Sequence, residues 1–192
     1  MSRKAAQSDW QSLIRHDSSP GGAAHGMDAC VEVPPSGTAL FRYVLRADMS
    51  RMRLPAAQSP ERVDGLWRHT CFEAFVRVSG AADYCEFNFA PSRHWAAYRF
   101  SGYRDGMTPI EGVPTPKISV RRFPDRLETD AAVNLVDVIA AQGSAPLQIG
   151  LCAVLEEENG SLSHWALKHG PGKADFHGPC GFALELALTY GR

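Results

Sequence analysis

Apolar and polar residues alternate with a period of two along most of the chain. Residues 71–78 place four apolar side chains on one face, and residues 84–89 repeat the pattern after a short loop that contains Gly80. This period is typical of a half-buried strand, and two such runs joined by a short glycine-containing loop predict a hairpin. The predicted strands are residues 41–47, 71–78, 84–89, 95–100, 118–122, 127–133, 147–155, 161–167 and 182–189.

Turn signals separate most of these strands. Asn159-Gly160 lies between two alternating runs and predicts a tight hairpin with a type I′ turn. Helical periodicity is confined to a short stretch at residues 137–142, and residues 53–64 form an expected long loop. Eight to ten short strands almost without helix predict an all-β fold, an antiparallel β-sandwich with jelly-roll or immunoglobulin-like topology.

Length and charge indicate the number of domains and the classes of partner. The chain has 192 residues, 44% of them hydrophobic and 21% charged, which fits one globular domain. We expect a single domain over residues 27–192, preceded by a flexible segment over residues 1–26 that is rich in Ser, Gly and Asp. A net charge of −1 and the lack of a long apolar run predict neither a nucleic-acid nor a membrane partner.

The cysteines and the N-terminus bear on the compartment. Five cysteines, an odd number, show no C-x-x-C spacing, so neither a redox motif nor a zinc ribbon is indicated. The first residues lack the apolar stretch of about 7–15 residues that a secretory signal needs. We therefore expect a cytoplasmic protein whose thiols are reduced and mostly buried.

Motifs for metals and for common catalytic chemistries are lacking. The seven histidines form no H-x-H or H-x-x-x-H pair. Consecutive carboxylates at residues 156–158 point to alternate faces of a strand, which favours a solvated hairpin tip over a calcium site. No G-x-S-x-G or P-loop sequence is found. No metal and no cofactor is predicted, with haem and Ca²⁺ left open as alternatives.

The polar face of the central hairpin is the most informative feature. Glu73 lies on its first strand, Glu86 and Asn88 lie on its second, and Trp67 precedes both. If these faces coincide, carboxylates and an amide that can pair with hydroxyl groups lie beside an aromatic ring that can cover the C–H face of a sugar. The alternative is a solvated outer sheet face with stabilising cross-strand pairs.

Three segments of the chain, at residues 66–76, 84–91 and 175–186, resemble DOMON-like domains and family-nine carbohydrate-binding modules. Residues 66–76 are similar to that family's Trp-x-x-Asp-x-Val-Glu-x-Phe strand, and residues 84–91 to its Tyr-x-Glu-Phe-x-x-x-Pro strand. Residues 175–186 resemble its closing Phe-His-x-Pro-x-x-Phe-x-x-Leu strand. Together they span most of the chain, from about residue 31 to residue 190. The resemblance implies a β-sandwich with a ligand site on its concave sheet or its rim.

The resemblance also implies roles for individual residues. Trp67 and Phe176 would clamp a terminal sugar between them, with Phe176 where the sugar-binding members carry tryptophan. Glu73 would be a hydrogen-bonding carboxylate, and Asn88 stands where those members place an arginine. The predicted ligand-binding residues are Trp67, Glu73, Glu86, Asn88, Phe176 and His177.

The resulting hypothesis is a non-catalytic domain that binds a small saccharide or a sugar-bearing metabolite. A haem-binding electron-transfer domain is one alternative, because a second branch of the superfamily holds haem between Met and His, and the chain offers Met49, Met52 and Met107. A glycoside-processing enzyme is another, and the separation of Glu73 and Glu86 would then decide its mechanism. The third alternative is a protein-interaction module.

Overall fold

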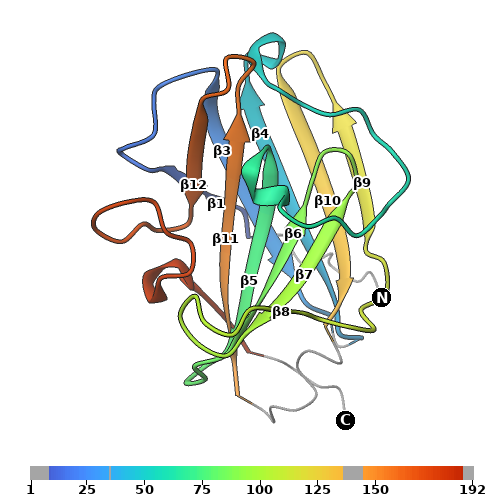
Figure 1. Cartoon of the computed structure of the whole chain (residues 1–192), viewed down its shortest axis with the longest axis vertical. Coiled ribbons are helices and arrows are strands. Elements are labelled where there is room, and N and C mark those ends of the chain that lie inside the picture. The colour runs from blue at the N-terminus through green and yellow to red at the C-terminus, as the bar shows by residue number, and fades with distance from the viewer. Residues whose placement is uncertain (1–8, 35, 136–144, 188–192) are drawn as a thin grey trace, which may run out of the picture.

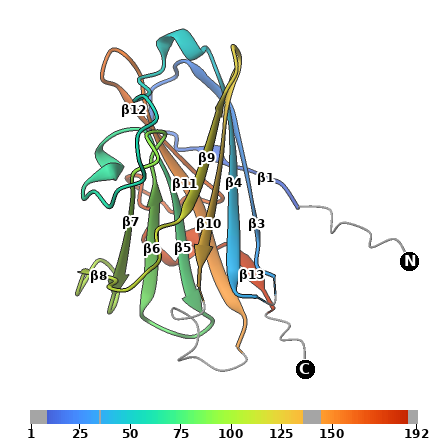
Figure 2. The ribbon, with the colours of Figure 1, turned by 90° about the vertical axis from the view of Figure 1, so that its right-hand side faces the viewer.

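Two antiparallel sheets pack face to face in the computed structural model, which describes residues 9–34, 36–135 and 145–187 (Figures 1 and 2). One sheet has the strand order β1-β3-β4-β10-β9, and the other the order β2-β12-β11-β5-β6-β7-β8, with β13 also paired to β11. All ladders between these strands are antiparallel, so the predicted β-sandwich is confirmed.

The elements have the following bounds. The strands of the first sheet are β1 (Gln11–Ser12), β3 (Ala24–Glu32), β4 (Thr38–Ala47), β9 (Lys117–Arg122) and β10 (Arg126–Asn134). The strands of the second sheet are β2 (Ile14–Arg15), β5 (Cys71–Val78), β6 (Tyr84–Phe89), β7 (Trp95–Phe100), β8 (Thr108–Pro109), β11 (Leu147–Glu156), β12 (Leu162–Ala166) and β13 (Leu184–Leu186). The described residues also include three short 3₁₀ helices, namely η1 (Met49–Arg51), η2 (Leu66–Arg68) and η3 (Pro179–Gly181).

The main core lies between the sheets and follows the alternation in the sequence. Phe72 from β5 and Phe87 from β6 face Tyr43 and Leu45 from β4, and all four are fully buried. The rings of Tyr43 and Phe72 stack with their centroids 5.2 Å apart. The Tyr43 hydroxyl donates a 2.8 Å hydrogen bond to the backbone carbonyl of Glu73, which ties the first sheet to the strand that carries the candidate site.

The outer face of the second sheet carries a second apolar cluster. Phe75, Tyr84, Tyr98 and Phe100 are buried there, and Trp67 of η2 packs partly against them. A solvated outer face would leave these residues exposed. Instead, η2 and the C-terminal segment (residues 174–182, which include η3) cover the face. Nearly every residue of β5 and β6 is therefore buried on one side of the sheet or the other.

Several local predictions need correction. The closing strand, predicted over residues 182–189, is limited to β13 in the described residues, and Phe182 packs on Phe75 with ring centroids 6.2 Å apart. The hairpin at Asn159-Gly160 is confirmed, but it is not a type I′ turn, because Gly160 has a positive φ (82°) and Asn159 does not. The short helix predicted at residues 137–142 lies outside the described residues.

The N-terminal part contributes more strand than the sequence predicted. Residues 9–26 contain β1, β2 and the start of β3, whereas a flexible segment was expected over residues 1–26. His16 and Ser19 are buried in this part, and the Ser19 hydroxyl accepts a 3.0 Å hydrogen bond from the backbone of His164. Residues 1–8 lie outside the described residues. None of the helices in the described part of the chain has the length and apolar character to cross a membrane.

Candidate functional site

A cavity of about 330 Å³ lies on the outer face of the second sheet. Trp67, Glu73, Glu86, Phe176 and His177 line it, which are five of the six residues predicted to bind a ligand. They come together because β5 and β6 pair with Glu73 directly opposite Asn88, so that Glu73 and Glu86 share one face two positions apart. The coincidence of the two polar faces, left open by the sequence, is therefore observed. Other lining residues are Phe100, Arg104, Met107, Val154, His164 and Ala174.

Glu73 is an unusual buried acid. The residue is 3% exposed, and its Oε1 atom has no hydrogen-bond partner among the described residues. Cys152 Sγ lies 4.0 Å from the other carboxyl oxygen. Burial raises the pKa of Glu73 well above its usual range, and the neighbouring Glu86 carboxylate raises it further. Two negative charges are therefore disfavoured at this site, and the pair tends to hold a proton.

Glu86 is held by Asn88, which the sequence placed among the ligand-binding residues. The Asn88 amide donates a 2.7 Å hydrogen bond to Glu86 Oε1, and its carbonyl oxygen lies 3.5 Å from Cys71 Sγ. Asn88 is fully buried, so its polar groups are used to orient Glu86. Burial raises the pKa of Glu86, while the bond from Asn88 and the charge of Arg104 act in the opposite direction.

His177 is fixed on the far side of Glu86. Tyr84 Oη accepts a 3.2 Å hydrogen bond from the Arg104 backbone and lies 2.7 Å from His177 Nδ1. We assign Tyr84 as the donor to Nδ1, which puts the imidazole proton on Nε2, 3.9 Å from a Glu86 oxygen. Burial, aided by the charge of Arg104, lowers the pKa of His177 to about 4, so the ring is neutral at pH 7.

The aromatic walls come from η2 and the C-terminal segment. Gly65 has a φ of 77° where the chain enters η2, a conformation that glycine adopts without strain. Trp67 then packs edge-on against Tyr98 with centroids 5.7 Å apart, and the Tyr98 hydroxyl donates a 2.6 Å hydrogen bond to Asp64. Phe176 approaches the cavity beside His164, whose ring centroid lies 5.9 Å away.

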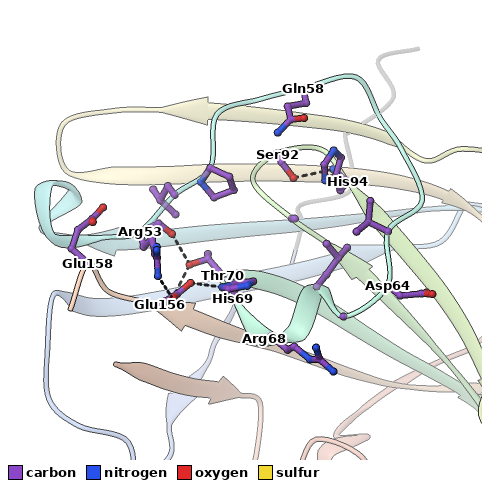
Figure 3. Close-up of a pocket in the computed structure, with 16 residues that line it drawn as sticks. Arg53, Gln58, Asp64, Arg68, His69, Thr70, Ser92, His94, Glu156 and Glu158 are labelled. Carbon is purple, nitrogen blue, oxygen red and sulfur yellow. Dashed lines mark hydrogen bonds and ion pairs between the residues drawn. The ribbon is translucent and has the colours of Figure 1, made fainter. Parts of the chain in front are cut away.

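A larger pocket, of about 590 Å³, is lined in part by Leu66 and Arg68 of η2 (Figure 3). Glu156 forms part of its wall, with one carboxyl oxygen 2.9 Å from Arg53 and the other 2.7 Å from His69 Nδ1. Ion pairing therefore outweighs burial and lowers the pKa of Glu156. This buried carboxylate is fully satisfied, whereas Glu73 is not, and for that reason the smaller cavity is the better candidate for recognition of a polar ligand.

The acidic run at residues 156–158 is consequently not a solvated hairpin tip. Glu156 and Glu157 are both buried, and only Glu158 is exposed. Glu157 accepts hydrogen bonds from Arg51 at 3.0 Å and from the Ala23 backbone at 2.8 Å. Because these oxygens already have partners, they fix the hairpin to the residue that precedes β3 and to η1.

The described residues contain no group of three or more His, Cys, Asp or Glu side chains arranged to hold a metal ion. All five cysteines are free thiols, and four of them are buried. Of the methionines considered for haem, Met107 lines the cavity together with His164 and His177, whereas Met52 lies in the main core.

Arg104 and Phe100 are among the lining residues that the sequence did not predict. Phe100 lies on the outer face of β7. The sequence predicted this strand but not which of its side chains point to which face of the sheet. Arg104 has a positive φ of 53° in the turn after β7, and both its Nε and Nη2 bond one Asp175 oxygen at 3.1 and 2.7 Å. Nothing in the sequence pattern pairs residues 104 and 175, since the contact depends on how two loops meet.

Comparison with known proteins shows the fold. No protein-family model and no curated protein sequence matches the chain. A solved structure from Bacteroides uniformis, described as that of a candidate carbohydrate-binding protein, superposes with a TM-score of 0.65 at 12% identity, covering 91% of this chain and 84% of its own. At this identity the match shows a shared β-sandwich fold.

Two further matches are family-nine carbohydrate-binding modules from Caldicellulosiruptor kristjanssonii. One, in complex with cellotriose, has a TM-score of 0.48 at 12% identity and covers 86% of this chain and 75% of its own. The other, in complex with glucose, has a TM-score of 0.46 at 10% identity and covers 86% and 76%.

Proposed function

We propose that this chain is a non-catalytic domain that binds a small saccharide, or the sugar part of a larger metabolite, in the cavity between η2 and the C-terminal segment. The observation that carries the proposal is the buried carboxyl oxygen of Glu73, which has no partner among residues 9–34, 36–135 and 145–187 and lies in a cavity that Trp67 and Phe176 also line. A buried polar atom without a partner is costly, and a ligand hydroxyl would satisfy it.

The chemistry of the other lining groups supports the same ligand class. Glu86 offers a hydrogen-bond acceptor and neutral His177 a donor at Nε2, while aromatic faces suit the apolar C–H surface of a pyranose ring. A cavity of about 330 Å³ suits a monosaccharide or one end of an oligosaccharide. The resemblance of residues 66–76, 84–91 and 175–186 to the family-nine modules adds to this reasoning.

Tryptophan fluorescence tests the proposal. The full chain is titrated with a panel of neutral and charged mono- and oligosaccharides, and a saturable change is expected with one sugar class. Trp67→Ala should abolish binding and leave the fold intact, as judged by circular dichroism. Trp10→Ala is the matched control, because Trp10 is 43% exposed and lies outside the cavity. Unchanged affinity in a folded Trp67→Ala protein would refute the site, and no binding across the panel would refute the function.

The absence of catalysis is part of the proposal and has its own test. A panel of aryl glycosides should not be hydrolysed above the background rate. Turnover that is lost on Glu73→Gln would replace the binding domain with a glycoside-processing enzyme that uses Glu73 and Glu86.

A further inference from the structure

The charges around the cavity are not balanced. Among the described residues, Arg104 is the one lining side chain that is cationic at neutral pH. Its guanidinium is already bound to Asp175, whose other oxygen accepts a 2.7 Å hydrogen bond from Tyr103. Burial lowers the pKa values of His164 and His177, so both rings are neutral at pH 7. Within the described part of the chain, Glu73 and Glu86 are left as two acidic groups without a cation of their own.

The missing positive charge matters more because the two acids are buried. Glu73 and Glu86 are 3% and 4% exposed, so water screens them weakly. Asn88 satisfies one oxygen of Glu86, but Glu73 Oε1 has no partner among the described residues. A hydroxyl can satisfy this oxygen by donating one hydrogen bond. An ammonium group can donate to both carboxyl groups and also supply the missing positive charge.

Aromatic side chains line the same space. Trp67, Phe100 and Phe176 all contribute to the cavity wall, and aromatic faces attract cations as well as C–H groups. An anionic ligand, such as a sugar acid, would meet the two carboxyl groups and be repelled. The cavity therefore discriminates by charge among ligands of similar shape.

We propose that the cavity selects a sugar with a free amino group, a hexosamine, whose ammonium group lies between the carboxyl groups of Glu73 and Glu86. This inference rests on the proposed function and names its ligand class. The ammonium donates hydrogen bonds to the two carboxyl groups, and the proton that the pair holds without ligand passes to solvent. No covalent bond forms or breaks in the sugar.

Other titratable and polar groups face the carboxyl pair from every element around it. They are Cys71 on β5, Tyr84 and Asn88 on β6, Tyr98 on β7, Cys152 on β11, His164 on β12, and Arg104, Asp175 and His177 from the loops. Burial also raises the pKa values of the Cys71 and Cys152 thiols well above their usual range, so they stay neutral. None of these groups supplies an uncompensated positive charge to the pair.

Calorimetry on the full chain tests this inference. Glucosamine, galactosamine and mannosamine are titrated at pH 6.5 beside glucose, galactose, mannose and N-acetylglucosamine. We expect one amino sugar to bind at least about ten-fold more tightly than its neutral parent, which corresponds to about 1.4 kcal/mol. Repeating the titration in two buffers with different ionisation enthalpies should show proton release for the amino sugar alone.

A pair of variants assigns the effect to the buried acid. Glu73→Gln keeps the shape and removes the charge, so the preference for the amino sugar should disappear while its neutral parent still binds. Glu111→Gln is the control, because that side chain is 87% exposed on a surface loop, and it should keep the preference. The proton-release measurement needs only the wild-type chain and therefore decides the matter if Glu73→Gln does not fold.

Each result has a distinct meaning. Equal or tighter binding of the neutral sugars would overturn the amino-sugar preference. Binding of the amino sugar without proton release would overturn the placement of its ammonium group between the two carboxyl groups. The saccharide function would stand in both cases. A preference that survives Glu73→Gln would also overturn that placement. No binding of any sugar would overturn both proposals.

Discussion

Protonation of His177 should destabilise the fold in mildly acidic solution. The imidazole is held against Phe75 and Phe100, with both ring centroids 5.0 Å from its own, and its side chain is only 15% exposed. Burial lowers its pKa from 6.5 to about 4. Between these two values the unfolded chain binds a proton that the folded chain does not, so stability falls as the pH falls.

The size of this effect follows from the interval between the pKa values of His177 in the unfolded and the folded chain. A difference of one proton changes the free energy of unfolding by about 1.4 kcal/mol per pH unit. From pH 6.5 down to about 4, the folded protein should therefore lose about 3 kcal/mol to this one side chain. The low exposure of the ring means that little of this is screened by solvent.

Urea unfolding of the wild type and of His177→Gln, from pH 7 to pH 4, measures the effect. The substitution removes ring contacts, which adds an offset that does not depend on pH. The difference in unfolding free energy between the two proteins should shift by about 3 kcal/mol in favour of the variant as the pH falls. A difference that is the same at pH 7 and pH 4 would show that the imidazole titrates normally in the folded protein and would refute the reasoning.

Two substitutions test backbone and core contacts next to the candidate site. In Gly150→Ala, the new Cβ would lie 2.8 Å from the carbonyl oxygen of Gly181, so β11 and η3 must separate, and thermal melting should show a loss of about 1–3 kcal/mol. Tyr43→Phe removes the 2.8 Å hydrogen bond from the buried hydroxyl to the Glu73 carbonyl and should cost about 1–2 kcal/mol in urea unfolding. Unchanged stability in either variant would contradict the packing described here.

Alternation predicted the strands that bury one clear apolar face. β5, β6 and β7 have the bounds expected from the sequence, because aromatic and β-branched residues recur there at every second position. β3 was not predicted, since its apolar positions are interrupted by polar and small residues and by Gly26, at a register shift. Its burial depends on pairing with β4, a contact that local pattern does not encode.

The candidate site, like the strands, was predicted only in part from the sequence. The sequence placed Glu73 and Glu86 on neighbouring strands, but only the observed register puts them on one face. Asn88 belongs to that face too, yet the fold uses it to hold Glu86 rather than to line the cavity. The role of Arg104 depends on a turn after β7 and on Asp175, seventy-one residues away in sequence. Alternation predicts which face a residue occupies, and tertiary contacts decide whether it meets a ligand.

The unpaired acid at the centre of the site should reduce stability at neutral pH. Because burial and Glu86 raise the pKa of Glu73, its unfavourable contribution is absent below its unfolded value of 4.5 and grows as the pH rises towards its folded value. His177 has the opposite effect across the same pH range, because it makes the fold more stable as the pH rises. The two effects partly cancel in the stability of the wild-type protein, so that measurement alone would reveal neither.

Glu73→Gln separates the two trends, since it removes the acid and leaves His177 in place. Measured by urea unfolding from pH 4.5 to pH 8, the variant should gain stability relative to the wild type as the pH rises. A flat difference would mean that Glu73 ionises in the folded protein as easily as in the unfolded chain, and the argument for a ligand that supplies its missing partner would lose its basis. A rising difference would show that this buried carboxyl reduces stability, which is common for a group retained for recognition rather than for packing.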